Sequence, residues 1–181
     1  MLFRSHDKKI GHYTISLHLH AKDDESYSKY WEKVFSIHFN KKVRFYQQET
    51  NGLRLTFYSK EIYLLIFKYL IIGKNKSLNV SLKEPLTNYS LDFLKMFVRG
   101  IIDTDGCVNK HGQVVLGVIS RKVVSQVKRI LQLNNISSKI STRKVRLNEN
   151  TLYELKIHKK EAINYLNLIG FSNRRKGYNI C

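Results

Sequence analysis

The sequence has few acidic residues, one proline, two cysteines and no long apolar run. Asp and Glu number 14 against 32 Lys and Arg, which gives a formal charge of +18 over 181 residues. So large a charge indicates a polyanionic partner, and it favours nucleic acid over an anionic membrane surface. The longest apolar segment, 62–72, is interrupted by Lys68 and is shorter than the roughly 20 residues of a membrane-spanning helix, so we expect no membrane partner.

The two cysteines, Cys107 and Cys181, are too far apart to form a zinc-binding spacing, and they are too few for a disulfide framework. They indicate a reducing compartment. We therefore expect a cytoplasmic, nucleoid-associated protein, or an organellar one in a eukaryotic host. With 43% hydrophobic residues, the chain can form a folded core, which excludes a disordered protein.

The spacing of apolar residues predicts the same order of elements in each half of the chain. In the first half the predicted elements are a strand over 13–19, a helix over 23–39, strands over 43–46 and 53–57, and a helix from Ser59 to about Leu70. In the second half they are a strand over 114–119, a helix over 120–133, strands over 139–146 and 151–157, and a helix over 159–169. Asn51-Gly52 is a strong signal for a hairpin turn in the first half.

The halves also align residue by residue at a constant shift of 100 residues. Residues 55–61 align with 155–161, and residues 76–80 align with 176–180. This pattern is typical of an internal duplication. It predicts an N-terminal unit, 1–86, and a C-terminal unit, 87–181.

Each unit is predicted to be α+β, with strands and helices in the order strand, strand, helix, strand, strand, helix, and with its helices on one face of an antiparallel sheet. The other face is then available for binding. The outward strand positions carry the basic and polar residues Lys42, Arg44, Tyr46, Arg54 and Thr56 in the first unit and Lys139, Ser141, Arg143 and Lys156 in the second. Such a face can follow the major groove of DNA, although lysines on strands also serve solubility and protect sheet edges.

A further helix is predicted over 90–106, and it ends in Asp103-Thr104-Asp105-Gly106. The helix is apolar, so two carboxylates beside a core need water, a cation or backbone amides as partners. Asp103 as a simple helix terminator is the alternative, but a carboxylate at a helix C-terminus opposes the macrodipole.

Residues 98–106 resemble the motif of the LAGLIDADG homing endonucleases, particularly the archaeal and intein-associated members. The motif residues that match outright are Gly100, Ile102, Asp103, Asp105 and Gly106. The resemblance extends to the order of strands and helices. It implies two sheets forming a DNA-binding saddle and a host element that is an intron, an intein or a free-standing gene.

The resemblance implies that two motif helices pack side by side and that each delivers one carboxylate to Mg²⁺ (or Mn²⁺). Asp105 is then the catalytic metal ligand, and Asp103 is a secondary metal ligand or a structural carboxylate. Family lysines near the metal point to Lys76 and Lys176 as catalytic, with Arg174 and Arg175 as neighbours of the second. Phosphate clamps or solvated loop charges are the alternative roles for both lysines.

The resemblance also assigns helix packing to Gly100, Thr104 and Gly106. We expect Gly100 to allow close approach of two helices and Gly106 to leave the helix with a positive φ.

The first unit departs from the family, because the shift of 100 aligns Asp105 with Ser5 and Gly106 with His6. We therefore expect this unit to lack its motif helix. Either two copies pair through the 90–104 helix as a homodimer, or another segment or polypeptide supplies the missing helix. Otherwise the protein binds DNA or intron RNA without cutting, as a maturase or regulator would. The first two explanations predict a site-specific endonuclease for double-stranded DNA.

Overall fold

The computed structural model describes residues 13–48, 51–72, 80–144 and 151–177. Contacts divide the chain into two compact units. Unit 1 comprises Met1–Lys68 with Asn173–Arg175, and unit 2 comprises Tyr69–Ser172 with Lys176–Cys181. Each unit has its own hydrophobic core.

The boundary between the units follows Lys68, whereas the sequence predicts it after residue 86. The strand β5 (Ser81–Leu82) explains the difference. Leu82 is buried in the core of unit 2, and its backbone N–H donates to Gln126 Oε1 over 3.0 Å. These contacts are not visible in the sequence pattern, because β5 is only two residues long.

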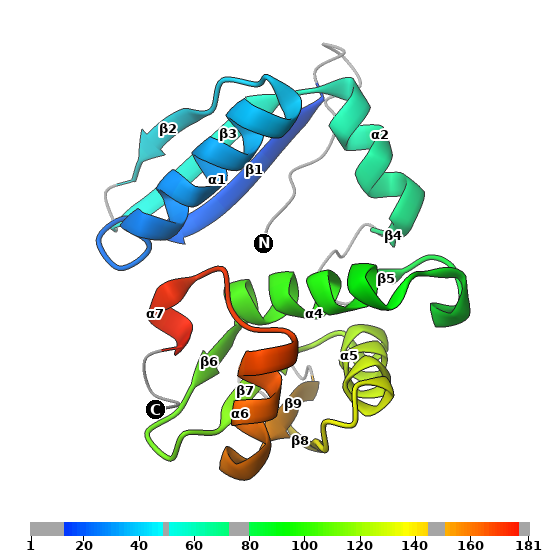
Figure 1. The fold of residues 1–181 in the computed structure, drawn as a ribbon. Helices are drawn as coiled ribbons and strands as arrows, with labels where there is room; N and C mark the ends of the chain where they lie inside the picture. The colour runs from blue at the N-terminus through cyan, green and yellow to red at the C-terminus, as the bar shows by residue number, and fades with distance from the viewer. Residues whose placement is uncertain (1–12, 49–50, 73–79, 145–150, 178–181) are drawn as a thin grey trace. The chain divides into compact units, whose positions relative to one another are not determined.

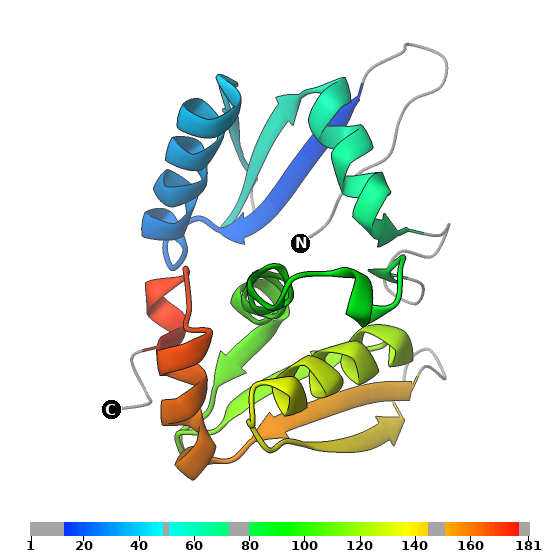
Figure 2. The ribbon, with the colours of Figure 1, turned by 45° about the vertical axis from the view of Figure 1, so that its right-hand side comes forward.

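Unit 1 contains a three-stranded antiparallel sheet with two helices on one face (Figures 1 and 2). Its elements are β1 (Thr14–His20), α1 (Glu25–Phe39), β2 (Arg44–Gln47), β3 (Gly52–Tyr58) and α2 (Lys60–Tyr69). The strands lie in the order β1-β3-β2. Asn51, in the turn between β2 and β3, has a φ of 56°, a conformation that asparagine tolerates, and the predicted hairpin is confirmed.

The core of unit 1 comes from alternate residues of its strands. Ile15 pairs with Phe57, and Leu17 pairs with Leu55, so these side chains share one face of the sheet. All four are buried together with residues of α1 and α2 such as Phe35 and Ile62. The opposite face therefore carries the polar residues of the same strands.

Unit 2 has a four-stranded antiparallel sheet in the order β6-β7-β9-β8 and a small β4-β5 ribbon. Its remaining elements are β4 (Leu70–Ile71), the 3-10 helix η1 (Leu86–Asn88), α4 (Leu91–Asp105), β6 (Gly106–Val108), β7 (Val114–Val118), α5 (Arg121–Leu133), β8 (Lys139–Lys144), β9 (Thr151–Ile157) and α6 (Lys159–Leu168). A short helix, α7 (Arg174–Gly177), follows, and its residues are divided between the two units.

The strand order β7-β9-β8 in unit 2 repeats the order β1-β3-β2 in unit 1, and β6 is added at the β7 edge. The equivalent core pairs are Val114 with Ile157 and Leu116 with Leu155. The duplication predicted from the sequence is thus present in the topology, and the predicted α+β class is confirmed.

The motif helix α4 forms where the sequence predicts it. Ser90 is its N-cap, and its Oγ accepts the N–H of Phe93 over 3.3 Å. Leu94, Val98 and Ile102 recur every four residues and are buried in the core of unit 2. The helix is therefore an integral part of unit 2, and its C-terminal end leads directly into β6.

Candidate nucleic-acid interface and metal site

The two carboxylates at the end of α4 lie in different environments. Asp105 is exposed. Asp103 is only 2% exposed, and its Oδ2 accepts the backbone N–H of Ser172 over 2.9 Å. Because a helix turns by about 100° per residue, residues two positions apart point to nearly opposite sides. Of the two roles predicted for Asp103, this geometry favours the structural one.

Asp103 and Arg99 lie one helical turn apart, and Arg99 contacts the C-cap of α6 while Asp103 contacts Ser172 in the segment that follows. Arg99 Nε donates to the carbonyl of Ile169 over 2.6 Å. Burial raises the pKa of the Tyr165 phenol, and the negative charge of Asp103 raises it further, while Arg99 lowers it. The sequence alone does not indicate this role for Arg99, which occupies the motif position where the family has alanine.

Gly106 does not have the positive φ that the sequence predicts, since its φ is −97°. A Cβ at this position would lie 2.7 Å from the Ile102 carbonyl oxygen and 2.8 Å from Ile102 Cγ2. Glycine is therefore required for space at the helix end and not for a left-handed backbone.

Gly100 and Thr104 lie one turn apart on α4. A Cβ at Gly100 would meet no atom of its own unit within 4 Å. Thr104 Oγ1 donates to the Gly100 carbonyl over 3.0 Å, so the threonine side chain folds back onto its own helix. Helix packing at these positions, as the resemblance implies, stays a prediction.

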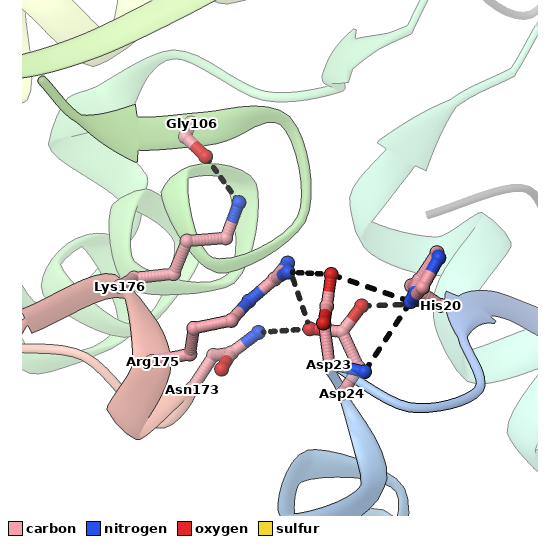
Figure 3. Close-up of polar contacts among 7 residues, drawn as sticks. All are labelled: His20, Asp23, Asp24, Gly106, Asn173, Arg175 and Lys176. Carbon is pink, nitrogen blue, oxygen red and sulfur yellow. Dashed lines mark hydrogen bonds and ion pairs between the residues drawn. The ribbon is translucent and has the colours of Figure 1, made fainter.

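Lys176 lies at the end of the motif helix, because its Nζ donates to the Gly106 carbonyl next to Asp105 (Figure 3). The sequence also places Arg175 next to Lys176 as a basic residue near the expected metal site. Arg175 instead pairs with Asp23 and Asp24. Of these two basic residues, Lys176 is therefore the one that contacts the end of the motif helix. Lys76, the other predicted lysine, lies outside the described residues.

A divalent cation would find one exposed carboxylate here, that of Asp105. Among the residues that the structure describes, there is no group of three or more His, Cys, Asp or Glu that could hold a metal. Carboxylate oxygen is a preferred ligand of Mg²⁺, which also retains water and binds phosphate oxygens. Asp105 thus fits part of a cation site, and the other ligands would have to come from elsewhere. Ser5 and His6, the residues aligned with Asp105 and Gly106, lie outside the described part of the chain.

The polar face of the unit 1 sheet carries the residues predicted to bind nucleic acid. Arg44 pairs with Thr56, and Tyr46 pairs with Arg54, on the side opposite the core. The Arg54 guanidinium lies 4.9 Å from the Tyr46 ring centroid. A second arginine and tyrosine stack in the same way, with Arg44 5.7 Å from the Tyr58 ring. Lys42 is exposed just before β2. We name this surface, with Arg44, Tyr46, Arg54 and Tyr58, the first polar face.

The polar face of the unit 2 sheet carries Lys139, Ser141 and Arg143 at alternating positions of β8, opposite Lys156, Glu154 and Leu152 of β9. Lys139 and Arg143 are exposed. Lys156 Nζ pairs with Glu154 Oε1 over 2.6 Å. We name this surface the second polar face. The sequence prediction omits Glu154. Because Glu154 lies two residues before Lys156 on β9, strand alternation would have identified it as a residue of the same face.

The motif helix ends at the edge of this second sheet. β6 pairs with β7 from Gly106 opposite Leu116 to Val108 opposite Val114. Asp105 lies one residue before this ladder begins, so the exposed carboxylate stands at the corner where α4 meets the sheet. The motif helix is thus continuous in the chain with the edge strand β6 of this sheet.

The sequence profile described as "LAGLIDADG-like domain" matches residues 92–170. This range contains the motif helix except for its first residue, Leu91, and all four strands of the unit 2 sheet. A comparison with curated proteins gives no match. The resemblance predicted from residues 98–106 is confirmed for the domain that contains them.

Solved structures with the same fold include the homing endonuclease I-DmoI in complex with DNA and Mn, at a TM-score of 0.66 and 12% identity over 93% of this chain and 87% of that chain. The N-terminal LAGLIDADG domain of DUF199/WhiA is similar at a TM-score of 0.57 and 16% identity, over 88% and 74%. Full-length DUF199/WhiA from Thermatoga maritima gives 0.59 and 15%, over 92% and 51%. At these identities the similarity establishes the fold.

The described residues contain no helix with the length and hydrophobicity to cross a membrane.

Proposed function

Since residues 92–170 form a LAGLIDADG-like domain, we propose that this protein binds double-stranded DNA at specific sites and hydrolyses phosphodiester bonds with Mg²⁺ or Mn²⁺. The observation that carries the proposal is the end of α4. There Asp105 is exposed, and Lys176 donates to the adjacent Gly106 carbonyl. A carboxylate and an ammonium group at one helix end suit a cation and the phosphate that it activates.

Asp105 would hold the divalent cation, which when bound supplies charge neutralisation at the scissile phosphate. The ammonium group of Lys176 would lie close enough to the helix end to orient a phosphate oxygen. Asp103 would keep the end of α4 attached to Ser172. This division assigns chemistry to the exposed aspartate and structural support to the buried one.

The polar faces would contact the DNA. Arg44 and Arg54 stack on tyrosine rings, which holds the planar guanidinium groups in defined orientations before binding. Arginine in such a position can read guanine in the major groove, and Lys42, Lys139, Arg143 and Lys156 would neutralise phosphates. The formal charge of +18 supports this choice of partner.

A second carboxylate opposite Asp105 would complete the site. A homodimer through the 90–104 helix would supply it as the Asp105 of the second copy. A partner polypeptide that provides a motif helix would supply it as a different residue. The open surroundings of Gly100 within unit 2 are compatible with either arrangement.

The second candidate function is binding of DNA or intron RNA without cleavage. One observation favours it, since the described residues contain a single motif helix and no cluster of three metal-ligating side chains. In this case the polar faces retain their role, and Asp105 has no chemical one.

The test compares Asp105→Asn with Asp92→Asn, which removes the same charge at the exposed start of α4. A randomised plasmid library is incubated with Mg²⁺ or Mn²⁺, and binding is measured separately by gel retardation. We expect cleavage by the wild type and by Asp92→Asn, and loss of at least about 100-fold in Asp105→Asn with DNA affinity maintained. Equal cutting by all three proteins would remove Asp105 from the chemistry. Retardation without cutting by any of them would establish the second candidate.

A further inference from the structure

A pocket of about 410 Å³ lies between α5 and the segment 84–87, which follows β5. The side-chain amide of Gln126 joins α5 to β5, since its Oε1 accepts the Leu82 N–H over 3.0 Å and its Nε2 donates to the Leu82 carbonyl over 3.3 Å. Beyond β5, the Glu84 N–H donates to Tyr89 Oη over 3.1 Å. All of these groups belong to unit 2, so the pocket is formed within that unit alone.

The lining of the pocket combines apolar and polar side chains. Pro85 and Leu86 supply apolar surface, while Ser125, Gln126 and Arg129 supply a hydroxyl, an amide and a guanidinium group from α5. The volume is in the range of about 300–1,000 Å³ that is usual for sites of small ligands. A single nucleobase can enter a space of this kind when it is unpaired and splayed out of its strand.

The outward side of α5 is basic at both ends of this pocket. Arg121 and Lys122 lie in the first turn, and Lys128 and Arg129 lie seven residues further on, about 10 Å along the helix axis. The stretch 106–148 contains no Asp or Glu. In the part of the chain that the structure describes, none of the four side chains forms an ion pair. We name these four residues the α5 basic surface.

The stability of α5 does not explain this placement of charge. Arg121 and Lys122 stand at the helix N-terminus, where positive charge opposes the macrodipole, and the last turn, where it would be favourable, has no basic residue. The positive charges are therefore better explained by an anionic ligand than by the needs of the helix.

The α5 basic surface is separate from the second polar face. α5 packs on the core face of the unit 2 sheet through residues such as Val123, Val127 and Ile130 (Figure 2). The second polar face is the opposite face of the same sheet. DNA bound to that face would leave the α5 basic surface unoccupied.

We infer that the α5 basic surface and the adjacent pocket bind single-stranded nucleic acid, with phosphates at the two basic pairs and one unpaired base in the pocket. A duplex could contact the basic pairs, but its bases stay stacked and would not use the pocket. This site goes beyond the proposed function, because neither Asp105 nor the polar faces take part in it.

Two other anionic partners fit less well. An acidic peptide matches the charge of α5, but the carboxylate of Glu84 in the pocket lining would repel its side chains, whereas the amino group of a base can donate to that carboxylate. A membrane surface needs large apolar anchors beside the cations, and Leu133 is the one large exposed apolar residue of α5.

The first experiment removes charge from the α5 basic surface. The double variant Lys122→Gln/Arg129→Gln is compared with Lys159→Gln/Lys160→Gln, which removes two charges from exposed positions of α6. Fluorescence anisotropy follows binding of a labelled 12-nucleotide oligouridylate and of a duplex DNA. We expect the α5 variant to bind the single strand at least about tenfold more weakly, with the log–log salt slope reduced by about 1.4, and the duplex within about threefold of wild type.

The α6 variant should bind both probes within about threefold of wild type. Arg54→Gln should weaken duplex binding and leave the single strand unchanged. No binding of the single strand by the wild type, or equal losses in the α5 and α6 variants, would overturn the inference. None of these results depends on cleavage, so failure here leaves the Asp105→Asn test unaffected, and absence of cleavage leaves this test unaffected.

The second experiment tests the pocket by comparing Ser125→Leu, which adds bulk to the lining without changing charge, with Ser125→Ala. The probes are the oligouridylate and an abasic phosphodiester of the same length. The wild type and Ser125→Ala should bind the strand with bases about tenfold more tightly than the abasic one, since base contacts add to phosphate contacts, and Ser125→Leu should lose most of this preference.

Equal affinity of the wild type for both probes, or for an oligoglutamate of equal charge, would overturn the assignment of a base to the pocket. A deoxyuridine strand of the same length identifies the sugar. Tighter binding of the RNA would show contacts to its 2′-hydroxyl groups, and equal binding would show a site for any unpaired strand; both results support the inference.

Discussion

The two units share the strand order β1-β3-β2 and β7-β9-β8, yet the equivalent helices α2 and α6 are buried to different extents. Tyr165 of α6 is fully buried, whereas Leu65, its counterpart in α2 at the shift of 100, is 44% exposed. In unit 2 the motif helix α4 contributes Val98 and Ile102 to the core that contains Tyr165. The described residues of unit 1 include no helix equivalent to α4. The comparison shows that the motif helix is a structural element of its unit as well as the carrier of Asp105.

The polar faces differ as well. Arg54 and Glu154 occupy equivalent positions, one opposite Tyr46 and the other opposite Ser141. The first polar face therefore presents stacked arginines, and the second presents a lysine paired with a carboxylate. Duplication preserved the pattern that builds each core, while the residues available for binding diverged.

The largest expected effect tests the difference in burial. Ile102→Ala should lower the free energy of unfolding of unit 2 by about 2–5 kcal/mol, because it leaves a cavity in a closed core. Leu65→Ala should change the stability of unit 1 by only about 0.5 kcal/mol. Urea unfolding, followed by hydrogen exchange resolved for each unit, measures both. Similar losses in the two variants would mean that α2 is covered as fully as α6.

The next effect concerns pH, since burial raises the pKa of Tyr165 in the folded state. The protonated phenol stabilises the fold below the unfolded pKa of about 10, and this contribution is lost as the pH rises further, at about 1.4 kcal/mol per pH unit. Tyr165→Phe should remove this slope and cost about 1 kcal/mol at neutral pH, because the phenol donates to the Gly170 carbonyl. The measurement is the unfolding free energy of both proteins from about pH 8 to 11. Parallel curves would contradict the prediction.

The smallest effect concerns the polar faces. Arg54→Gln should weaken binding of a target DNA about tenfold, and Glu154→Gln should strengthen it by a few-fold, because the first removes a positive charge and the second a negative one. Titrations at several salt concentrations measure both, and the slope should change by about one unit in opposite directions. Ser26→Ala, at an exposed position on α1, is the control. Equal changes in DNA affinity in the two variants would show that Arg54 and Glu154 do not affect binding in opposite directions.

Much of each unit could be predicted because its signals are local. The hairpin at Asn51-Gly52, the N-cap at Ser90 and the end of α6 before Gly170, which has a φ of 71°, depend on a few neighbouring residues. The difference in burial between Asp103 and Asp105 could also have been inferred from helical geometry, since Leu94, Val98 and Ile102 mark the buried face of α4. The reason for glycine at position 106 could not be inferred in this way, because a side chain there is excluded by contact with Ile102 and not by the φ of residue 106.

The amino-acid sequence by itself determined the duplicated α+β pattern, the motif helix and the excess of positive charge, since alternation, helical spacing and composition are properties of the chain. Only the tertiary structure decided that β5 belongs to unit 2, that Asp103 is buried against Ser172, and that Arg175 binds Asp23 and Asp24. The physical reason is distance along the chain. Such contacts form between residues far apart in sequence, and their partners become known only when the strands and helices have packed.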